Sequence, residues 1–305
     1  MFFSNYFNIG VSAFVLFVGA YIFFIPSRRN VQKYFLVLCS FFSLWIFCFG
    51  VRHLTPPEFR HIVLDWMLIP PIFFPILLDK IICLVINSKS SFPKWKIASL
   101  GLVVNYFLWA ALSCSYSTIE DSYNFTYSST VHYHILIWYS TFYVGYSIFR
   151  LSKFSFHLSG SLRVQTTLMN GGIILTLTFA IIFIYILPLM GIFYAYWSSI
   201  GVLISILLWA MAILHFDAFE TRSFIMRNPY VARRQIPILS RYTFKPILAL
   251  HRLLDPLDYR IKLRNSRVEI VRYLLHYHLI LMKDSNLNHS TQVRKLTSIF
   301  ERFMK

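Results

Sequence analysis

The sequence is organised as long apolar segments separated by short polar connections. Seven of these segments approach the length of about 20 apolar residues that a helix needs to cross roughly 30 Å of hydrocarbon. They cover residues 6–25, 34–51, 62–86, 97–114, 131–149, 168–189 and 195–216. We therefore predict an all-α polytopic membrane protein, with a seven-transmembrane helix bundle over residues 1–216 and a tail over residues 217–305.

Composition agrees with a chain that folds in lipid. Apolar residues make up 57% of the 305 residues and charged residues only 13%, whereas soluble domains carry about 25% charged residues. A lipid bilayer is therefore the first partner that we expect. The four cysteines lie within or at the end of apolar segments without paired spacing, which favours small buried thiols: Cys39, Cys48, Cys83 and Cys114.

Positive charge alternates along the short connections. The first, third and fifth connections each hold three basic residues and no acid, and the others hold little or no positive charge. The basic residues are Arg28, Arg29 and Lys33, then Lys89, Lys94 and Lys96, then Arg150, Lys153 and Arg163. Because Lys and Arg accumulate on the cytoplasmic side, this pattern predicts an outside N-terminus and a cytoplasmic C-terminus. No positive charge precedes the first apolar segment, so we expect an uncleaved span.

The tail from residue 217 to residue 305 is strongly basic and contains no glycine. It holds 17 of the 29 Lys and Arg residues and 7 of the 12 acids. Phosphate-binding loops rely on glycine, so we expect no ATP-binding kinase module in these 89 residues. Basic segments beside a membrane are attracted to anionic lipid headgroups, which we expect as a second partner.

Two helical patterns follow the proline-rich beginning of the tail. Ser266 is a predicted helix N-cap with Glu269 at the capping-box position, and a second amphipathic pattern follows Ser290. Short amphipathic helices of this kind can dock onto a cytoplasmic signalling protein. Four prolines prevent the tail from being one long helix: Pro229, Pro237, Pro246 and Pro256.

Few ionisable residues occur within the predicted spans, and such residues usually face the bundle interior or a cavity. Asp65 and Asp79 lie 14 residues apart, within about 40° of one helix face, although the prolines between them can rotate the two halves. With Trp66, His132 and His134 they are our candidates for binding an unknown small ligand. The same residue types are also common at wet membrane interfaces.

No catalytic motif or paired-carboxylate arrangement occurs in the spans, so we predict no enzyme activity and no cofactor. His132 and His134 are two residues apart and point to different sides of a helix, which argues against a metal site. The seventh segment has no lysine to form a retinal Schiff base. We expect no nucleic-acid partner.

The sixth and seventh segments carry a recognisable set of residues. Arg163 and Gln165 enter the sixth segment, Leu187, Pro188 and Gly191 end it, and Ala212, Ile213 and Leu214 close the seventh. Over residues 6–220 the chain resembles the N-terminal seven-transmembrane region of bacterial sensor histidine kinases. The resemblance implies a structural role for these motif residues and a receptor whose outward or intramembrane ligand site is read by a cytoplasmic output domain.

After the seventh segment this chain departs from the pattern of the family. The family commonly has the sequence Arg-Tyr-Arg-Leu-Phe here, whereas this chain has His215, Asp217 and Ala218. A basic tail follows where the family has an output domain. We therefore predict a sensor without catalytic output of its own, which signals through a separate protein. A small transporter or permease subunit, with Asp65 and Asp79 on its path, is the first alternative, and a membrane scaffold or assembly factor is the second.

Overall fold

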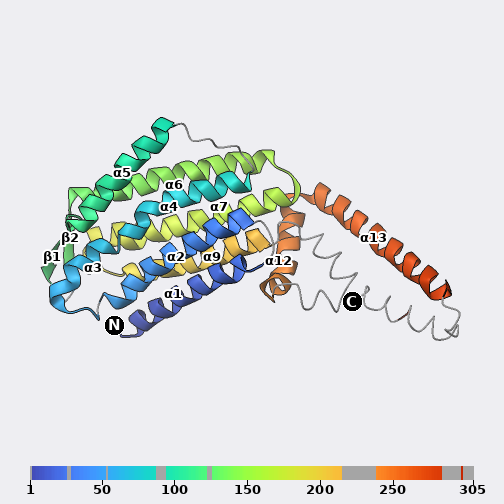
Figure 1. Cartoon of the computed structure of the whole chain (residues 1–305), viewed down its shortest axis with the longest axis horizontal. Coiled ribbons are helices and arrows are strands. Elements are labelled where there is room, and N and C mark those ends of the chain that lie inside the picture. The colour runs from blue at the N-terminus through green and yellow to red at the C-terminus, as the bar shows by residue number, and fades with distance from the viewer. Residues whose placement is uncertain are drawn as a thin grey trace. The chain divides into compact units, whose positions relative to one another are not determined.

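The computed structural model describes residues 2–25, 29–52, 54–86, 94–121, 126–214, 238–283 and 297. The chain divides into two compact units (Figure 1). The first contains residues 1–157 and 166–214, and the second contains residues 158–165 and 215–305. The second unit thus takes Leu158–Gln165 from the start of a long helix in addition to the tail.

Helices of the first unit coincide with the seven predicted apolar segments. They are α1 (Phe2–Phe23), α2 (Arg29–Val51), α3 (Arg60–Trp66) with α4 (Ile69–Val85), α5 (Lys94–Leu112), α6 (Val131–His157), α7 (Gly160–Ala180) and α9 (Ser198–Leu214). The short 3₁₀ turns η1 (Pro57–Phe59) and η3 (Ala195–Trp197) precede α3 and α9. The third apolar segment is therefore divided, because the chain makes a turn at Met67 and Leu68 between α3 and α4.

Among the residues that the structure describes, five stretches are long and apolar enough to cross a membrane, which makes this a mostly helical membrane protein. They are Asn5–Phe23, Asn30–Val51, Pro57–Val85, Gly160–Leu189 and Ala195–Leu214. The apolar part of α5, Ala98–Leu112, is shorter. Helix α6 has 27 residues, about 40 Å at 1.5 Å per residue, but Ser, Thr, Tyr and His along it lower its hydropathy.

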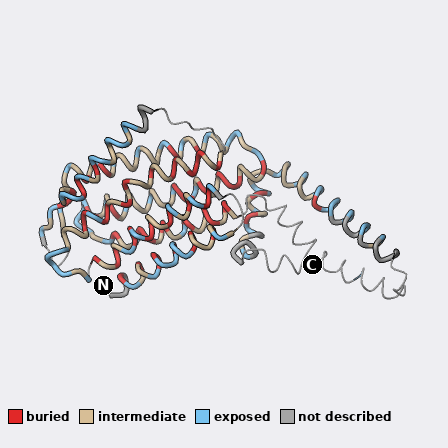
Figure 2. The backbone as a smooth tube through the Cα atoms, in the orientation of Figure 1, coloured by how far each residue is buried: buried red, intermediate tan, exposed pale blue. Residues whose placement is uncertain are grey.

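Small residues bring the helices of the first unit close together. A Cβ atom added to Gly19 on α1 would lie 2.6 Å from Cys39 Cβ on α2. One added to Gly172 on α7 would lie 2.8 Å from Trp209 Cδ1 on α9. Van der Waals packing through small residues is a main source of helix association in lipid. Buried residues accordingly collect along the facing sides of the helices (Figure 2).

A two-stranded antiparallel sheet joins α5 to α6, which the all-α prediction did not include. Strands β1 (Ser117–Asp121) and β2 (Thr126–Ser129) pair Ser117 with Ser129 and Ile119 with Tyr127. The hairpin falls in the acidic fourth connection, where Ser, Thr and Tyr are compatible with strands.

Helix α7 ends in an irregular sequence of turns. A π-helical turn, η2 (Ile181–Ile186), is followed by one short turn, α8 (Leu187–Leu189). Gly191 has a φ of +77°, and the N–H groups of Gly191 and Ile192 donate to the carbonyl oxygens of Pro188 and Leu187. These two bonds form the Schellman motif that terminates helices at glycine. The Leu-Pro-x-x-Gly pattern is thus a helix stop.

The described part of the tail in the second unit forms two helices, α12 (Ile238–Leu254) and α13 (Pro256–Lys283). The Asp255 carboxylate accepts a bond from the Asp258 N–H at 3.1 Å, so Asp255 caps α13 and Pro256 occupies its first position. The predicted start at Ser266 is therefore wrong, because α13 runs through it and buries its side chain. The second amphipathic pattern, after Ser290, lies outside the described ranges except for Thr297.

Candidate functional site

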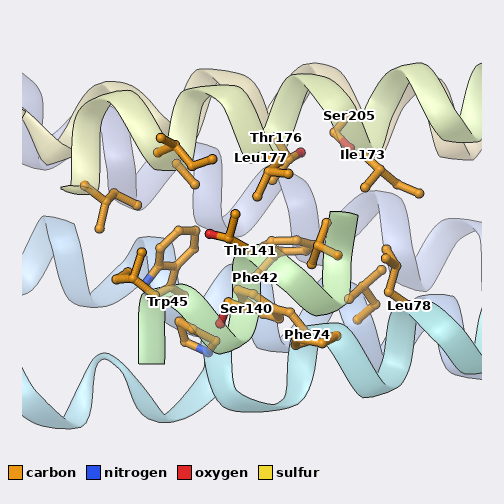
Figure 3. A pocket seen from close by; sticks show the side chains of 18 of the residues that line it. Phe42, Trp45, Phe74, Leu78, Ser140, Thr141, Ile173, Thr176, Leu177 and Ser205 are labelled. Carbon is orange, nitrogen blue, oxygen red and sulfur yellow. The ribbon is translucent and has the colours of Figure 1, made fainter. Parts of the chain in front are cut away.

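A cavity of about 120 Å³ lies inside the helix bundle of the first unit (Figure 3). Side chains from α2, α4, α6, α7, η2 and α9 form its walls. The wall contains aromatic rings, aliphatic side chains and a few hydroxyl groups, including Phe42, Trp45, Phe74, Leu78, Ser140, Thr141, Ile173, Thr176, Leu177 and Ser205. No lining residue is charged. The cavity can therefore hold an apolar guest of modest size.

Two polar atoms of the cavity wall have no hydrogen-bond partner among the described residues. They are the indole Nε1 of Trp45 and the hydroxyl Oγ1 of Thr176, and both atoms are buried. Among the other polar groups of the wall, Trp209 Nε1 donates to the Met169 carbonyl oxygen at 3.0 Å. Buried polar atoms are nearly always paired, so the two free groups require explanation.

Irregular helices shape one side of the cavity. Helix α4 contributes Pro71 and Pro75, and the π-helical turn η2 contributes Ile184 and Tyr185. The Tyr133 hydroxyl donates to the Ile184 carbonyl oxygen at 2.7 Å, which provides a partner for a backbone group of the widened turn. Single π-helical turns occur frequently at functional sites.

Asp65 holds the β-hairpin to α3. Its carboxylate accepts bonds from the Tyr116 N–H at 2.8 Å and the Ser117 hydroxyl at 2.5 Å. His61 Nε2 lies 2.8 Å from the Ser117 carbonyl oxygen. A space of about 10 Å³, bordered by Asp65 and Trp45, lies beside this contact. Asp65 thus fastens an outer connection to the bundle.

Arg52 provides a second buried charge beneath the hairpin. It lies just after α2, is 3% exposed, and its guanidinium carbon is 5.6 Å from the Phe49 ring centroid. Burial lowers the pKa of Arg52, an effect that nearby Tyr127 opposes. Burial also raises the pKa of Tyr127, and Arg52 partly offsets this. Arg52 is therefore part of the packed structure.

Buried Asp79 forms an ion pair with partly exposed Arg150. Arg150 Nη1 on α6 lies 2.9 Å from Asp79 Oδ1 on α4 and donates to Cys83 Sγ at 3.3 Å. Asp79 is 2% exposed. The sequence placed Arg150 in the fifth connection, but α6 continues seven residues beyond it. Asp79 therefore has a structural partner that joins two helices.

The remaining candidates lie apart from one another. The Tyr106 hydroxyl is 2.6 Å from His132 Nδ1, which joins α5 to α6 near the surface. His134 Nδ1 is 3.2 Å from the Tyr185 hydroxyl on η2, and Trp66 is 48% exposed. None of Asp65, Trp66, Asp79, His132 and His134 lines the central cavity. Successive side chains of a helix point in different directions, and the turn after α3 separates the two aspartates.

The residues that carry the family resemblance lie at helix ends or in buried positions. Pro188 is buried and Gly191 ends the helix, as described above. Gln165 is 4% exposed, and Arg163 lies close enough to Asp255 to influence its charge.

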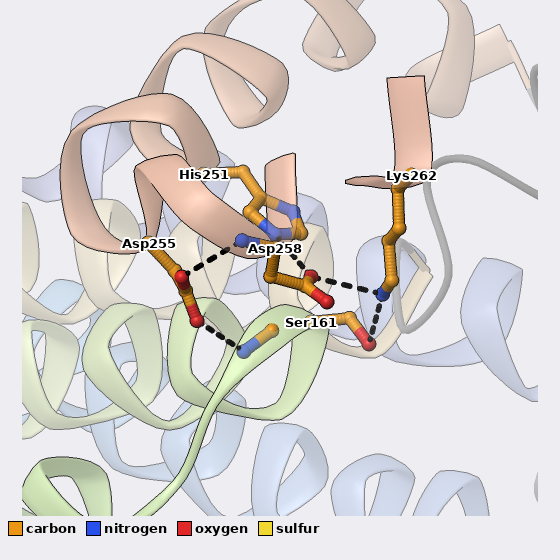
Figure 4. Close-up of polar contacts among 6 residues, drawn as sticks. Ser161, His251, Asp255, Asp258 and Lys262 are labelled. Carbon is orange, nitrogen blue, oxygen red and sulfur yellow. Dashed lines mark hydrogen bonds and ion pairs between the residues drawn. The ribbon is translucent and has the colours of Figure 1, made fainter. Parts of the chain in front are cut away.

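A cluster of polar contacts lies in the second unit, where the first residues of α7 meet the corner between α12 and α13 (Figure 4). The Gly160 N–H donates to Asp255 Oδ2 at 2.8 Å. Asp258 Oδ2 lies 2.9 Å from His251 Nε2 and 3.4 Å from Lys262 Nζ. We call Gly160, His251, Asp255, Asp258 and Lys262 the tail joint.

Asp255 is the acid of the tail joint with the clearest electrostatic perturbation. The Gly160 and Asp258 N–H groups donate to its carboxylate and lower its pKa, and His251 and Arg163 act in the same direction. The beginning of α7 also carries the partial positive charge of a helix N-terminus. The joint thus prefers an ionised Asp255.

No known family model, curated protein or solved structure matches this chain. The assignment of function therefore depends on the geometry. Sequence reasoning missed the cavity because its lining is made of ordinary apolar residues from six elements. It also missed the tail joint, although the succession Asp255, Pro256, Leu257, Asp258 was a readable helix-start signal.

Proposed function

We propose that this protein is a membrane sensor without catalytic output of its own, which signals through a cytoplasmic partner. In this proposal the chain crosses a bacterial inner membrane seven times, with its N-terminus outside and its basic tail in the cytoplasm, as the connection charges favour. The observation that carries the proposal is the uncharged cavity among the helices of the bundle, with two buried, unpaired polar groups in its wall.

A ligand in this cavity acts by favouring one arrangement of the surrounding helices over another. Helix α7 is suited to report that change. Its residues Ile173 and Thr176 line the cavity, and its first residue, Gly160, donates to Asp255 in the tail joint. One continuous helix therefore carries both the ligand-contacting residues and the residues that hold the tail.

The tail offers a surface for the partner. Helix α13 exposes a series of large apolar side chains along its length: Leu257, Ile261, Val268, Val271, Leu275 and Leu279. Basic residues lie between them in the sequence, and Arg264 and Arg272 are exposed. A helix that exposes apolar side chains at helical spacing can dock into an apolar groove of another protein.

The transporter alternative has less support. It requires carboxylates that are open to a substrate or proton path, whereas Asp65 holds the hairpin and Asp79 holds Arg150. Flux through reconstituted vesicles that disappears in Asp79→Asn, with the fold retained, would favour the transporter. The scaffold alternative predicts that changes in the cavity wall leave function intact while loss of residues 266–305 abolishes it.

Site-specific crosslinking tests the sensor proposal. A photoreactive amino acid placed at Leu275 on α13 is expected to capture a cytoplasmic kinase, phosphatase or other signalling protein in intact cells. The matched control places the same amino acid at exposed Ser128 in the hairpin, which should not capture that protein. Capture of an integral subunit with an associated ATPase at Leu275 would contradict the sensor and favour a transport complex.

A further inference from the structure

The chemistry of the central cavity defines its ligand more closely than the proposed function does. Resting on the sensor function, we propose that the cavity binds an uncharged, lipid-soluble molecule that carries a hydrogen-bond acceptor, such as a ketone or ester carbonyl. Three properties of the cavity support this: the absence of charge in its wall, its size, and its two unpaired polar groups.

The wall excludes charged and strongly polar ligands. All residues that line the cavity are uncharged, and the ion pair of Asp79 and Arg150 is not among them. Moving an ion into such surroundings without a partner is strongly unfavourable. A sugar or amino acid would also leave many of its polar groups unpaired. The ligand is therefore apolar over most of its surface and reaches the bundle from the lipid.

The volume limits the buried part of the ligand. About 120 Å³ is close to the roughly 150 Å³ of apolar protein cavities that accept a single benzene molecule. One ring or a short branched chain therefore fills the space. A longer molecule would place only one end in it.

The unpaired groups require an acceptor. Trp45 is 5% exposed, and its indole N–H can only donate. The Thr176 hydroxyl can donate to the same kind of atom, and a carbonyl oxygen accepts from either. Trp45 also borders the small space beside Asp65, which has room for about one water. Thr176 borders only the larger of the two cavities. A change at Thr176 therefore tests ligand binding in that cavity alone.

Binding of a matched pair of fluorinated probes to the full chain in nanodiscs tests the proposal by ¹⁹F NMR. The probes are 4′-fluoroacetophenone, which has the carbonyl, and 1-ethyl-4-fluorobenzene, which lacks it. We expect the ketone to bind about fivefold more tightly, the usual value of one hydrogen bond. Thr176→Val, which nearly keeps the side-chain shape, should weaken binding of the ketone more than binding of the hydrocarbon, and Trp45→Phe should lower the ratio of the two affinities in the same direction.

Matched variants control for changes in packing. Thr178→Val alters an exposed threonine two residues further along the same helix, and Trp138→Phe alters an exposed tryptophan. Neither should change the binding of either probe. Ala180→Leu fills part of the cavity and should abolish both. Equal binding of the two probes to the unmodified protein, or equal losses of both in Thr176→Val, would overturn the proposal.

Two lipid compositions distinguish a bilayer lipid from a dissolved signal as the source of the acceptor. If the ester carbonyl of a lipid occupies the cavity, the ketone binds more weakly in ester-linked than in ether-linked phosphatidylcholine. If a separate molecule is the ligand, the ketone binds with the same affinity in both lipids. Either result supports the proposed chemistry, provided that the ketone binds more tightly than the hydrocarbon. Failure of the sensor function is detected separately, as loss of partner capture at Leu275 while the ketone preference persists.

Discussion

Buried ionic groups in this protein join elements that are distant in the sequence. Asp65 fastens the hairpin to α3, and Asp79 fastens α6 to α4 through Arg150. Ionisable residues within spans are often functional, and for that reason the sequence made both aspartates candidates for ligand binding. The structure gives each aspartate its own internal partner.

The ion pair of Asp79 and Arg150 can be tested by removing one charge or both. Asp79→Asn leaves Arg150 without its carboxylate, and we expect the free energy of unfolding to fall by about 2–3 kcal/mol. Asp79→Leu combined with Arg150→Met should recover most of this loss, because no buried charge is then unpaired. Thermal unfolding in one detergent measures both. Equal destabilisation by the single and the double change would contradict a paired role.

The tail joint should depend on pH through Asp255. Its pKa is lowered in the folded protein, so its stabilising contribution is present above the ordinary aspartate pKa of about 4 and is lost as pH falls through the folded pKa. Asp255→Asn retains a capping side chain but removes the charge. We expect the tail to loosen below about pH 4 in the unmodified protein and to show a weaker pH dependence in the variant.

A fluorophore at exposed Arg264 reports this loosening through its anisotropy between pH 3 and pH 7. Glu269→Gln, which alters an exposed acid of α13 outside the joint, serves as the control and should retain the pH response. An identical response in Asp255→Asn would show that another acid controls the joint.

At the scale of helices, close contacts are concentrated at particular glycines. Gly172 faces Trp209 and Ser205 of α9, whereas a Cβ at neighbouring Gly171 would meet nothing within 4 Å. Gly172→Ala should therefore overpack the contact between α7 and α9 and cost about 1–3 kcal/mol of unfolding free energy. Gly171→Ala is the matched control and should show no such cost. Equal effects in thermal unfolding would mean that Gly172 matters only through helix propensity.

The sequence predicts helices more successfully than it predicts their exact surroundings. Apolar length locates the long helices, because lipid requires long runs with internally satisfied backbone, but not all of their ends: α6 continues to His157 and α7 begins at Gly160, outside the predicted segments 131–149 and 168–189. The hairpin escaped prediction because β1 and β2 are short and polar and depend on Asp65, which is about 50 residues away in the chain. Ser266 had the pattern of an N-cap, but the helix had already begun at Pro256.

At the scale of the whole molecule, the division into an apolar bundle and a basic tail is visible in composition alone, while the cavity is not. Its walls come from helices far apart in the chain, and the residues that line it are the same Phe, Leu and Ile that fill any membrane core. Only packing distinguishes an unfilled space from a filled one. The number of crossings and their orientation stay predictions from the connection charges.

Cysteine accessibility in intact cells tests the membrane arrangement most directly. In a chain whose four native cysteines are replaced, Ser128→Cys marks the hairpin and Arg264→Cys marks α13, and both positions are exposed. A membrane-impermeant thiol reagent should label Cys at position 128 in intact cells and Cys at position 264 only after the membrane is opened. Labelling of position 264 from outside, or of both positions from the same side, would contradict a bundle that presents its hairpin outward and its tail to the cytoplasm.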